Sequence, residues 1–401
     1  MRIVGGVYRE RSVFPQGDVL YGSGGRAAAA LRELCSDITL TTFVGRQRSG
    51  DLRYFAKEWR VTLDDIVVES SVSFDYYHGL SAPVIRPTRL PLADAPRLER
   101  TGDVILQFGM LEGDVIVHGK RVVFDPQNPE SPRYFDDQGS TAGELAYILN
   151  RGEAARLTGE SEICDAAAEL LARKNVKVVV IKCGAYGAQV FENGGSCTIP
   201  AYETPRVWPI GSGDVFAAVF AFLWGKERRP AVEAAGFASR AASLYCGKMQ
   251  IPLRPTELFS EPFTYPPLRL TKSPAESHIY LAGPFFTMGQ LWLVEEAADA
   301  LRHAGFQVFS PFHDVGLGDA DAVVEKDIQG IERADVLFAL CDGLDPGTLF
   351  EVGYAVKLGI PVVAFGENTT EESMKMLRGT GCKIFSDFTT AIYHAKWEAL
   401  R

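Results

Sequence analysis

The sequence lacks the cysteine pattern of a disulfide-bonded or zinc-binding protein. Its seven cysteines are scattered, odd in number and never spaced as C-x-x-C, so neither a disulfide framework nor a zinc site is indicated. Long apolar runs are also missing. None approaches the length that spans a membrane, and the charges at residues 9–11 interrupt any apolar signal core at the start. We therefore expect a cytoplasmic protein in a reducing compartment.

Positive charge is scarce as well. The 401 residues carry a formal net charge of −10, and the sequence pI is near 5.3. An acidic surface does not attract a nucleic-acid backbone or an anionic membrane, so neither is expected as a partner, although small anionic ligands can bind at local clusters of donors. With 46% hydrophobic and 23% charged residues and no internal repeat, the composition is that of a globular protein with two or three domains.

Short β-type runs alternate with longer helical runs in both halves of the chain, which predicts parallel sheets covered by helices. In the first half we expect strands at residues 104–108, 121–124 and 176–182, and helices at residues 27–34 and 166–173. Residues 67–87 are rich in β-forming side chains and break this alternation. They predict a small lid of antiparallel strands.

The periodicity stops between residues 251 and 277, where six prolines crowd together. Proline at that density continues neither a helix nor a central strand, so we expect a linker. A second alternation follows, with strands at residues 279–282, 307–310, 336–340 and 361–365 and helices at residues 291–304, 322–333 and 349–358. We predict a first domain at residues 1–250 and a doubly wound flavodoxin- or Rossmann-like domain at residues 278–401.

The run Gly211-Ser212-Gly213-Asp214, which precedes an apolar stretch, indicates a phosphate-binding turn. Two glycines let the backbone turn tightly and aim its N–H groups at an anion, and the positive end of the following helix favours negative charge. An acid in that first turn would lie beside the transferred phosphate and could deprotonate an attacking hydroxyl. The alternative is an ordinary helix start, in which Ser212 or Asp214 caps free backbone donors.

Two further segments of the first half could serve a nucleotide. Asn150 and Glu153 close a predicted helical run one turn apart, where an amide and a carboxylate could hold water on Mg²⁺ and orient a phosphate. Solvated helix polarity is the alternative for this pair. Gly184 and Gly187 follow the predicted strand at residues 176–182 and form a turn that could approach a nucleotide.

Taken in this order, the segments resemble the PfkB-type (ribokinase-like) carbohydrate and nucleoside kinases over most of residues 1–260. The motifs are Gly22-Ser23-Gly24-Gly25 before an Ala-rich helix, Asp125-Pro126-Gln127-Asn128, Asn150-x-x-Glu153, Gly184 with Gly187, and Gly211-x-Gly213-Asp214. The resemblance implies a ribokinase-like α/β fold with Asp214 as the catalytic base. The residues it implies for the other roles are Gly211, Ser212 and Gly213 as the anion hole, Gly184 and Gly187 at ATP, Asn150 and Glu153 at Mg²⁺, and Gly24, Gly25 and Arg26 at the acceptor.

The first domain departs from that family at two acceptor-binding positions. Members usually carry an Asp near the end of the first strand, where this chain has Val7-Tyr8-Arg9-Glu10, and an Asn after the first glycine pair, where it has Arg26. A guanidinium is a permanently charged fork of donors suited to carboxylate or phosphate. We therefore expect either an anionic acceptor or a domain that has lost phosphoryl transfer, and the intact Gly-x-Gly-Asp motif favours an active kinase.

Three acids of the second domain lie on successive strand-to-helix connections. Asp327 is on a predicted helix, Asp345 follows the predicted strand at residues 336–340, and Glu351 begins the next helix, so the three can converge at one edge of the sheet. Such a cluster suits displacement at an anomeric carbon, where one carboxylate attacks C1′ and a second acid protonates or orients the departing base. For Glu351 the alternative is a capping box with Thr348, and the two aspartates could be plain surface acids.

This part of the chain, from residue 278 to about residue 390, resembles the nucleoside 2-deoxyribosyltransferase family. The motifs are Gly283-x-Phe285-Phe286-Thr287-x-x-Gln290, Asp327-Ile328, and the offset from Asp345 to Glu351 before Val352-Gly353-Tyr354-Ala355. The resemblance implies Glu351 as the nucleophile held by Tyr280, Asp327 and Asp345 as contacts or proton donors for the base, and Gly283, Phe286 and Gln290 in the substrate pocket. Some relatives hydrolyse nucleoside 5′-monophosphates, and members often complete the site with a neighbouring subunit, so we expect a homo-oligomer.

We interpret the chain as a bifunctional enzyme of nucleoside or nucleotide metabolism that acts on small molecules. The first domain would use ATP and Mg²⁺ to phosphorylate a sugar or nucleoside hydroxyl, and the second would cleave or transfer at an N-glycosidic bond. In the alternative, the kinase-like domain binds a nucleotide or sugar without phosphorylating it and regulates the glycosidase. Arg26 and the missing early Asp favour that alternative. A scaffold of two inert folds is disfavoured, because both sets of acids are complete.

Overall fold

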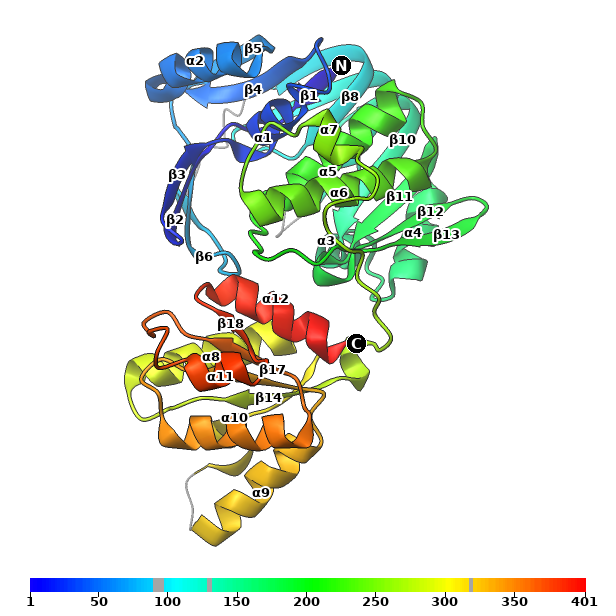
Figure 1. The fold of residues 1–401 in the computed structure, drawn as a ribbon. Helices are drawn as coiled ribbons and strands as arrows, with labels where there is room; N and C mark the ends of the chain where they lie inside the picture. The colour runs from blue at the N-terminus through cyan, green and yellow to red at the C-terminus, as the bar shows by residue number, and fades with distance from the viewer. Residues whose placement is uncertain (89–96, 128–131, 317–319) are drawn as a thin grey trace. The chain divides into compact units, whose positions relative to one another are not determined.

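The computed structural model describes residues 1–88, 97–127, 132–316 and 320–401. These residues form two compact units, and Figure 1 labels their helices and strands. The first unit contains Met1–Thr204 and Trp208–Pro267, and the second contains Pro205–Val207 and Leu268–Arg401. Among the described helices, none combines the length and the apolar composition needed to cross a bilayer.

A sheet of nine described strands lies at the centre of the first unit. Its order is β13 (Gly195–Ile199), β12 (Ala188–Glu192), β11 (Val176–Lys182), β10 (Thr141–Asn150), β9 (Asp114–Asp125), β8 (Arg97–Phe108), β1 (Arg2–Val4), β4 (Thr39–Gly45) and β5 (Thr62–Val68). The strands from β11 to β5 are parallel, and β12 and β13 extend one edge antiparallel. Valine and isoleucine dominate β11, as expected for a strand buried on both faces.

Helices cover both faces of this sheet. One apolar cluster joins it to α1 (Gly22–Leu31), α2 (Ser49–Trp59), α5 (Ser212–Phe220) and α6 (Ala231–Lys248), and the other joins it to α3 (Arg151–Thr158) and α4 (Ile163–Leu171). A π-helical segment, η4 (Ala221–Lys226), continues α5. The predicted strands at residues 104–108, 121–124 and 176–182 are parts of β8, β9 and β11, and the two predicted helices overlap α1 and α4.

A separate sheet of four described strands forms the predicted lid. Its order is β3 (Gly17–Leu20), β2 (Arg9–Phe14), β6 (Ser73–His78) and β7 (Val84–Arg86), and β2, β3 and β6 are labelled in Figure 1. The pair β6 and β7 is antiparallel, as predicted for residues 67–87, but β2 joins β6 in parallel. Sequence analysis missed β2 and β3, because short and largely polar strands carry little apolar periodicity.

The proline-rich stretch at residues 251–277 is shared between the two units. Its residues up to Pro267 belong to the first unit, where Leu253 and Leu258 are buried in the core and a short helix forms, α7 (Pro255–Leu258). The rest belongs to the second unit. The predicted domain limits at residues 250 and 278 therefore stay a proposal.

The second unit is built on five described parallel strands. Their order is β15 (Gln307–Phe309), β14 (His278–Ala282), β16 (Val336–Leu340), β17 (Val362–Phe365) and β18 (Lys383–Phe385). Numbered along the chain, this order is 2-1-3-4-5, the doubly wound order of flavodoxin-like sheets. The order reverses between β14 and β16, so ligands are expected at the carboxyl ends of these two strands.

Helices cover this sheet on both faces as well. The apolar face that contains Tyr280 packs against α9 (Ala320–Glu332) and α10 (Pro346–Leu358), whereas α8 (Met288–Arg302) and α12 (Phe388–Ala399) contact the sheet and one another, and α11 (Lys375–Gly379) adjoins β18. Sequence analysis missed α12, although Asp387 is its N-cap and accepts from the N–H of Thr390 at 2.7 Å. The predicted fold class is confirmed: an α/β unit with a small β lid is followed by a doubly wound parallel sheet.

Candidate active sites

The glycine turn at residues 209–214 starts helix α5. Gly211 is the N-cap residue and has a φ of 79°, a left-handed conformation that favours glycine. The Ser212 hydroxyl donates to the carbonyl of Pro209 at 2.8 Å, and no described side chain caps the helix. Side-chain capping therefore does not account for Ser212 or Asp214. The N–H groups of Ser212 and Asp214 donate to the carbonyls of Pro209 and Gly211 at 3.0 and 3.1 Å, so the feature of this helix start that favours an anion is the partial positive charge of the amino end of α5.

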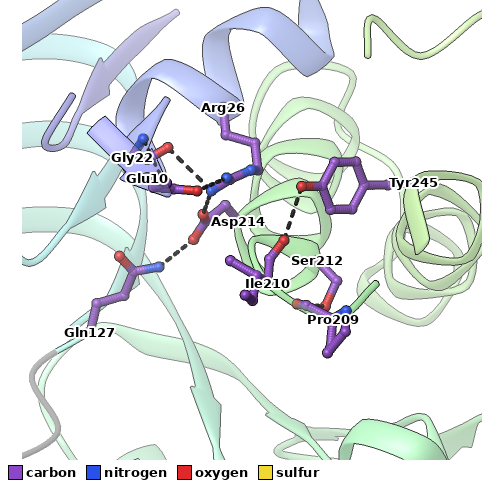
Figure 2. Close-up of polar contacts among 9 residues, drawn as sticks. All are labelled: Glu10, Gly22, Arg26, Gln127, Pro209, Ile210, Ser212, Asp214 and Tyr245. Atoms are coloured by element: carbon purple, nitrogen blue, oxygen red, sulfur yellow. Dashed lines mark hydrogen bonds and ion pairs between the residues drawn. The ribbon is translucent and has the colours of Figure 1, made fainter. Parts of the chain in front are cut away.

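The carboxylate of Asp214 is held from two sides. Its Oδ2 accepts from Nη1 of Arg26 at 2.8 Å, and its Oδ1 accepts from Nε2 of Gln127 at 2.5 Å, as Figure 2 shows. Arg26 lies on α1 and Gln127 follows β9, so three segments far apart in the chain meet at this carboxylate. Asp214 is 8% exposed. Both of its oxygens are therefore occupied by protein donors.

Arg26 is the centre of a buried ion triad. It also pairs with Glu10 from β2, whose second carboxylate oxygen accepts from the N–H of Gly22 at 3.0 Å. Arg26 is 2% exposed, and the rings of Tyr21 and Tyr245 lie 5.4 and 5.9 Å from its guanidinium carbon. Burial disfavours the charged guanidinium, but the nearby carboxylates outweigh burial and raise the pKa of Arg26. Arg26 therefore stays charged and is shared by two carboxylates.

Replacing Arg26 by Met is expected to lower the unfolding free energy of the first unit by about 3–5 kcal/mol, because Glu10 and Asp214 would be left buried without a cation. The measurement is denaturant unfolding. The control is Arg46→Met, since Arg46 pairs with Glu69 at 3.0 Å and both side chains are more than 70% exposed. Arg46→Met should lower the unfolding free energy by no more than about 1 kcal/mol. Equal losses in the two variants would contradict the triad's role.

Gly24 and Gly25, predicted at the acceptor, lie in the first turns of α1, and both are buried. A Cβ at Gly24 would come 2.4 Å from the carbonyl oxygen of Gly5, and one at Gly25 would come 3.0 Å from the Trp59 ring. Close packing of α1 thus requires small residues at both positions. That packing places the next residue, Arg26, beside α5.

Asn150 and Glu153 form a reciprocal capping box at the start of α3. The N–H of Asn150 donates to Oε2 of Glu153 at 2.7 Å, and the N–H of Glu153 donates to Oδ1 of Asn150 at 2.8 Å. The predicted helical run before Asn150 was wrong, because residues 141–150 form strand β10. Tertiary pairing in the sheet overrides the helix-favouring Glu-Leu-Ala composition of this stretch. Asn128, quoted with the same motifs, lies outside the described residues.

The turn of Gly184 and Gly187 follows β11, as predicted. Both glycines have positive φ angles, 58° and 88°. A Cβ at Gly187 would come 2.1 Å from the carbonyl oxygen of Ile199, so close approach to β13 explains this glycine. A Cβ at Gly184 would meet nothing within 4 Å, which leaves that side of the turn open.

Sequence analysis did not single out Glu10 or Lys182 as members of this site. Glu10 lies in a lid strand that apolar periodicity could not reveal. Lys182 ends the buried strand β11, and its Nζ contacts Oδ2 of Asp125 at 2.7 Å. A charged side chain at the carboxyl end of a buried parallel strand, where ligands bind in such folds, is the signal that could have found Lys182.

In the second unit, Tyr280 contacts Glu351. Tyr280 lies on β14, one of the two strands between which the order of the sheet reverses. The Tyr280 hydroxyl, from β14, donates to Oε1 of Glu351 on α10 at 2.6 Å. Burial raises the pKa of Glu351 to about 7, the Tyr280 hydrogen bond lowers it, and the charges of Asp327 and Asp345 raise it. These couplings bring the three predicted acids into one electrostatic cluster, and the capping box that was the alternative for Glu351 does not form.

The two aspartates of the cluster differ in what they contact. Asp345 is the N-cap of α10, and its Oδ2 accepts from the N–H of Thr348 at 2.8 Å. Asp327 Oδ1 is buried and has no hydrogen-bond partner within the described part of the chain. Burial raises the pKa of Asp327. A buried carboxyl without a partner is costly, so Asp327 is the acid of the cluster that fits contact with a ligand.

The predicted pocket residues Gly283, Phe286 and Gln290 lie on the segment after β14. A Cβ at Gly283 would come 3.0 Å from Cβ of Leu340 at the end of β16, which requires a small residue here. Gln290 belongs to a capping box, in which its Oε1 accepts from the N–H of Thr287 at 3.0 Å. Phe286 is 71% exposed, so it is not a core residue and remains available to a base.

Tyr280→Phe is expected to move the pH dependence of base release to higher pH. The proposed nucleophile works when ionised, so activity should rise as pH passes the pKa of Glu351, about 7, and loss of the hydroxyl should raise that pKa by about one further unit. The control is Tyr354→Phe, because the Tyr354 hydroxyl donates to Glu332 at 2.9 Å on the surface of the same unit. A profile that stays in place in Tyr280→Phe would count against Glu351 as the nucleophile.

The carboxylates beside the glycine turn fit the ligand preferences of Mg²⁺. Asp125 is fully buried, and its Oδ1 has no hydrogen-bond partner among the residues described. Burial raises the pKa of Asp125, against the lowering effect of Lys182, and the charges of Glu153 and Asp214 raise it further. No described cluster of three or more metal-binding side chains could hold an ion by itself. Donor phosphates would have to complete the coordination, as is usual for Mg²⁺.

Two family models match the chain. Residues 117–252 match the pfkB family carbohydrate kinase, and residues 279–385 match the nucleoside 2-deoxyribosyltransferase family. Both resemblances expected from the sequence are thereby confirmed, and the chain combines domains of these two kinds. The kinase match contains Asn150, Lys182 and Asp214 but does not reach Arg26.

Solved structures of ribokinase-family kinases are similar to the chain. A pyrophosphate-dependent kinase of that family, in complex with a pyrophosphate analogue and myo-inositol, is 14% identical, with 63% of this chain and 97% of that chain covered and a TM-score of 0.47. Ribokinase from Giardia lamblia is 16% identical, with coverages of 62% and 92% and a TM-score of 0.46. Fructokinase from Vibrio cholerae, bound to fructose, ADP and calcium, is 15% identical, with coverages of 62% and 93% and a TM-score of 0.45.

Proposed function

We propose that the second unit cleaves or transfers at the N-glycosidic bond of a (deoxy)nucleoside or its 5′-monophosphate. The observation that carries this proposal is the 2.6 Å contact between the Tyr280 hydroxyl and Glu351, which holds a partly buried carboxylate near the switch point of the sheet. Asp327, whose buried Oδ1 has no hydrogen-bond partner in the described part of the chain, interacts electrostatically with both side chains. The family match of residues 279–385 supports the same chemistry.

The reaction follows from these roles. Glu351 attacks C1′ as the bond from C1′ to the base nitrogen breaks, so the sugar becomes esterified to Glu351. The departing base takes a proton from Asp327, whose buried Oδ1 has no hydrogen-bond partner among the described residues, while Asp345 orients the base. Water or a second base then attacks C1′, releases Glu351 and returns a proton to Asp327.

The test of this activity is incubation of the protein with (deoxy)nucleosides and their 5′-monophosphates, with released bases identified by mass spectrometry. A free base, or a new nucleoside when a second base is added, is expected from at least one substrate. Intact substrates throughout would contradict the proposal.

For the first unit we infer ATP-dependent phosphorylation of a sugar or nucleoside hydroxyl, with Asp214 taking the hydroxyl proton. The kinase-family match and the uncapped amino end of α5 support this inference. Mg²⁺, when bound, would neutralise the donor phosphates, and Asp125 with Glu153 would hold it. Because Arg26 and Gln127 occupy both oxygens of Asp214, an acceptor hydroxyl has to replace one of these donors before proton transfer.

The contact between Arg26 and Asp214 favours a second candidate function. If no acceptor displaces Arg26, the first unit binds a nucleotide or sugar without phosphorylating it and regulates the second unit. The complete burial of the triad is the observation behind this alternative. Ligand binding without any new phosphate ester would identify it.

We further propose a cytoplasmic homo-oligomer with small-molecule ligands. In this proposal the kinase domain covers residues 1–250, the linker residues 251–277, and the glycosidase domain residues 278–401. The net charge of −10 supports small-molecule ligands over nucleic acid. Sedimentation analysis tests the oligomer, and a monomer at working concentration would contradict it.

A further inference from the structure

Lys182 lies at the carboxyl end of β11, inside the first unit's site. Its Nζ donates to Oδ2 of Asp125 at 2.7 Å, and Asp125, at the end of β9, is fully buried. In the sheet, β10 separates β9 from β11, so the pair reaches across the carboxyl end of a third strand. This edge of a parallel sheet is where ligands bind in such folds.

The ammonium of Lys182 also adjoins the glycine turn. A Cβ built on Gly213 would come 3.3 Å from Nζ of Lys182. Gly213 is in the first turn of α5, whose amino end carries partial positive charge and no side-chain cap. The partly buried ammonium of Lys182 and the positive end of α5 thus lie at the same place.

Lys182 and Arg26, the two cations of the site, differ in the number of carboxylates with which each forms an ion pair. Arg26 is shared by two carboxylates, Glu10 and Asp214. Among the residues that the structure describes, Lys182 forms an ion pair with one carboxylate, that of Asp125, whereas an ammonium has three donors. Its remaining donors are the ones that can turn to a phosphate.

The carboxylates around Lys182 outnumber the cations, so a bound phosphate needs the positive charge of Lys182. Glu10, Asp125, Glu153 and Asp214 supply four carboxylates to this part of the unit, against the two cations Arg26 and Lys182. A polyphosphate is itself strongly negative, and like charges in a buried site repel strongly. Without Lys182 the imbalance would grow where the donor phosphates have to lie.

We propose that Lys182 binds the terminal phosphates of the phosphoryl donor at the glycine turn, and that Asp125 is the positioning residue that holds its ammonium there. The proposal rests on the phosphoryl-donor site proposed above. A structural ion pair between β9 and β11 is the competing explanation. The two differ in one respect: only a phosphate-binding role makes donor affinity depend on Lys182.

The test compares the full chain with the double variant Lys182→Gln, Asp125→Asn, which keeps size and hydrogen bonding but removes both buried charges, so folding is expected. The matched control is Lys120→Gln, Asp103→Asn, because this pair, 2.8 Å apart, is more than 70% exposed at both residues. Calorimetry with ADP and with inorganic pyrophosphate measures binding, both without Mg²⁺, because Asp125 is also proposed to hold that ion. We expect affinity for both probes to fall by about 10- to 100-fold in the first variant and to stay unchanged in the control.

Measurement of phosphoryl transfer distinguishes the proposed role of Lys182 from the proposed kinase activity. Where phosphoryl transfer occurs, the variant Lys182→Arg should raise KM for the donor while KM for the acceptor stays constant, because Arg keeps the charge but changes its geometry. Binding that depends on Lys182 without any turnover would support the Lys182 site and refute the kinase activity. Unchanged affinity in the double variant, or a wild-type protein that binds neither probe, would overturn the inference.

Discussion

Glu351→Gln is expected to abolish base release, with a fall of about 10⁴-fold or more, the scale seen when a catalytic nucleophile is removed. Gln keeps the shape of Glu and can still accept from the Tyr280 hydroxyl, which lies 2.6 Å from the carboxylate. It has no negative charge with which to attack C1′. The substitution therefore removes the chemistry while preserving the packing of α10 against β14.

The matched control for this prediction is Glu332→Gln. Glu332 also accepts from a tyrosine hydroxyl, that of Tyr354 at 2.9 Å, but this contact is on the surface of the second unit, and Glu332 is not among the groups that shift the pKa of Glu351. Base release should be unchanged in this control, measured by mass spectrometry on the same substrates. If Glu351→Gln kept more than about a tenth of the wild-type rate, a different nucleophile would have to be sought.

Asp214→Asn is expected to reduce phosphoryl transfer by about 10²- to 10⁴-fold, the usual contribution of a general base. The amide keeps the size of the carboxylate but cannot take the acceptor proton. Base release by the second unit should be unaffected, since Asp214 belongs to the first unit. New phosphate esters, measured with Mg-ATP present, provide the readout.

The control for Asp214→Asn is Asp103→Asn, because Asp103 is an exposed acid of the same unit that pairs with Lys120. Its phosphoryl transfer should match that of the wild type. Full phosphoryl transfer in Asp214→Asn would rule out Asp214 as the base. Ligand binding without phosphoryl transfer in the wild type would instead support the regulatory alternative, in which Arg26 keeps Asp214 paired.

Sequence patterns predicted the elements that have strong periodicity or composition. Both ends of β11 and β16 agree with the prediction, because valine, isoleucine and leucine runs bounded by polar residues leave few alternatives. The sequence predicts a helix where strand β10 forms, because the Glu-Leu-Ala segment favours a helix locally. Hydrogen bonding to the neighbouring strands β9 and β11 makes this segment a strand.

Long-range pairing within the sites was harder to predict. The sequence showed that Arg26 replaces the usual Asn, but its two carboxylate partners are 16 and 188 residues away, and one lies in an unpredicted lid strand. In the second unit the acids could be predicted, because Asp327 lies in the connection after β15 and Asp345 and Glu351 lie in the connection after β16, and such connections converge at one edge of a parallel sheet. Asp345 caps α10, and the Tyr280 hydroxyl donates to Glu351. Both contacts depend on side-chain geometry, which the spacing of residues in the sequence does not reveal.

The central claim is that the chain holds two separate carboxylate sites with different chemistry. One measurement tests it most directly: wild type, Glu351→Gln and Asp214→Asn are incubated with a panel of nucleosides and 5′-monophosphates, with and without Mg-ATP, and free bases and phosphate esters are quantified by mass spectrometry. The account predicts that Glu351→Gln loses only base release and that Asp214→Asn loses only phosphate esters. A wild type that forms neither product, or a single substitution that removes both, would contradict it.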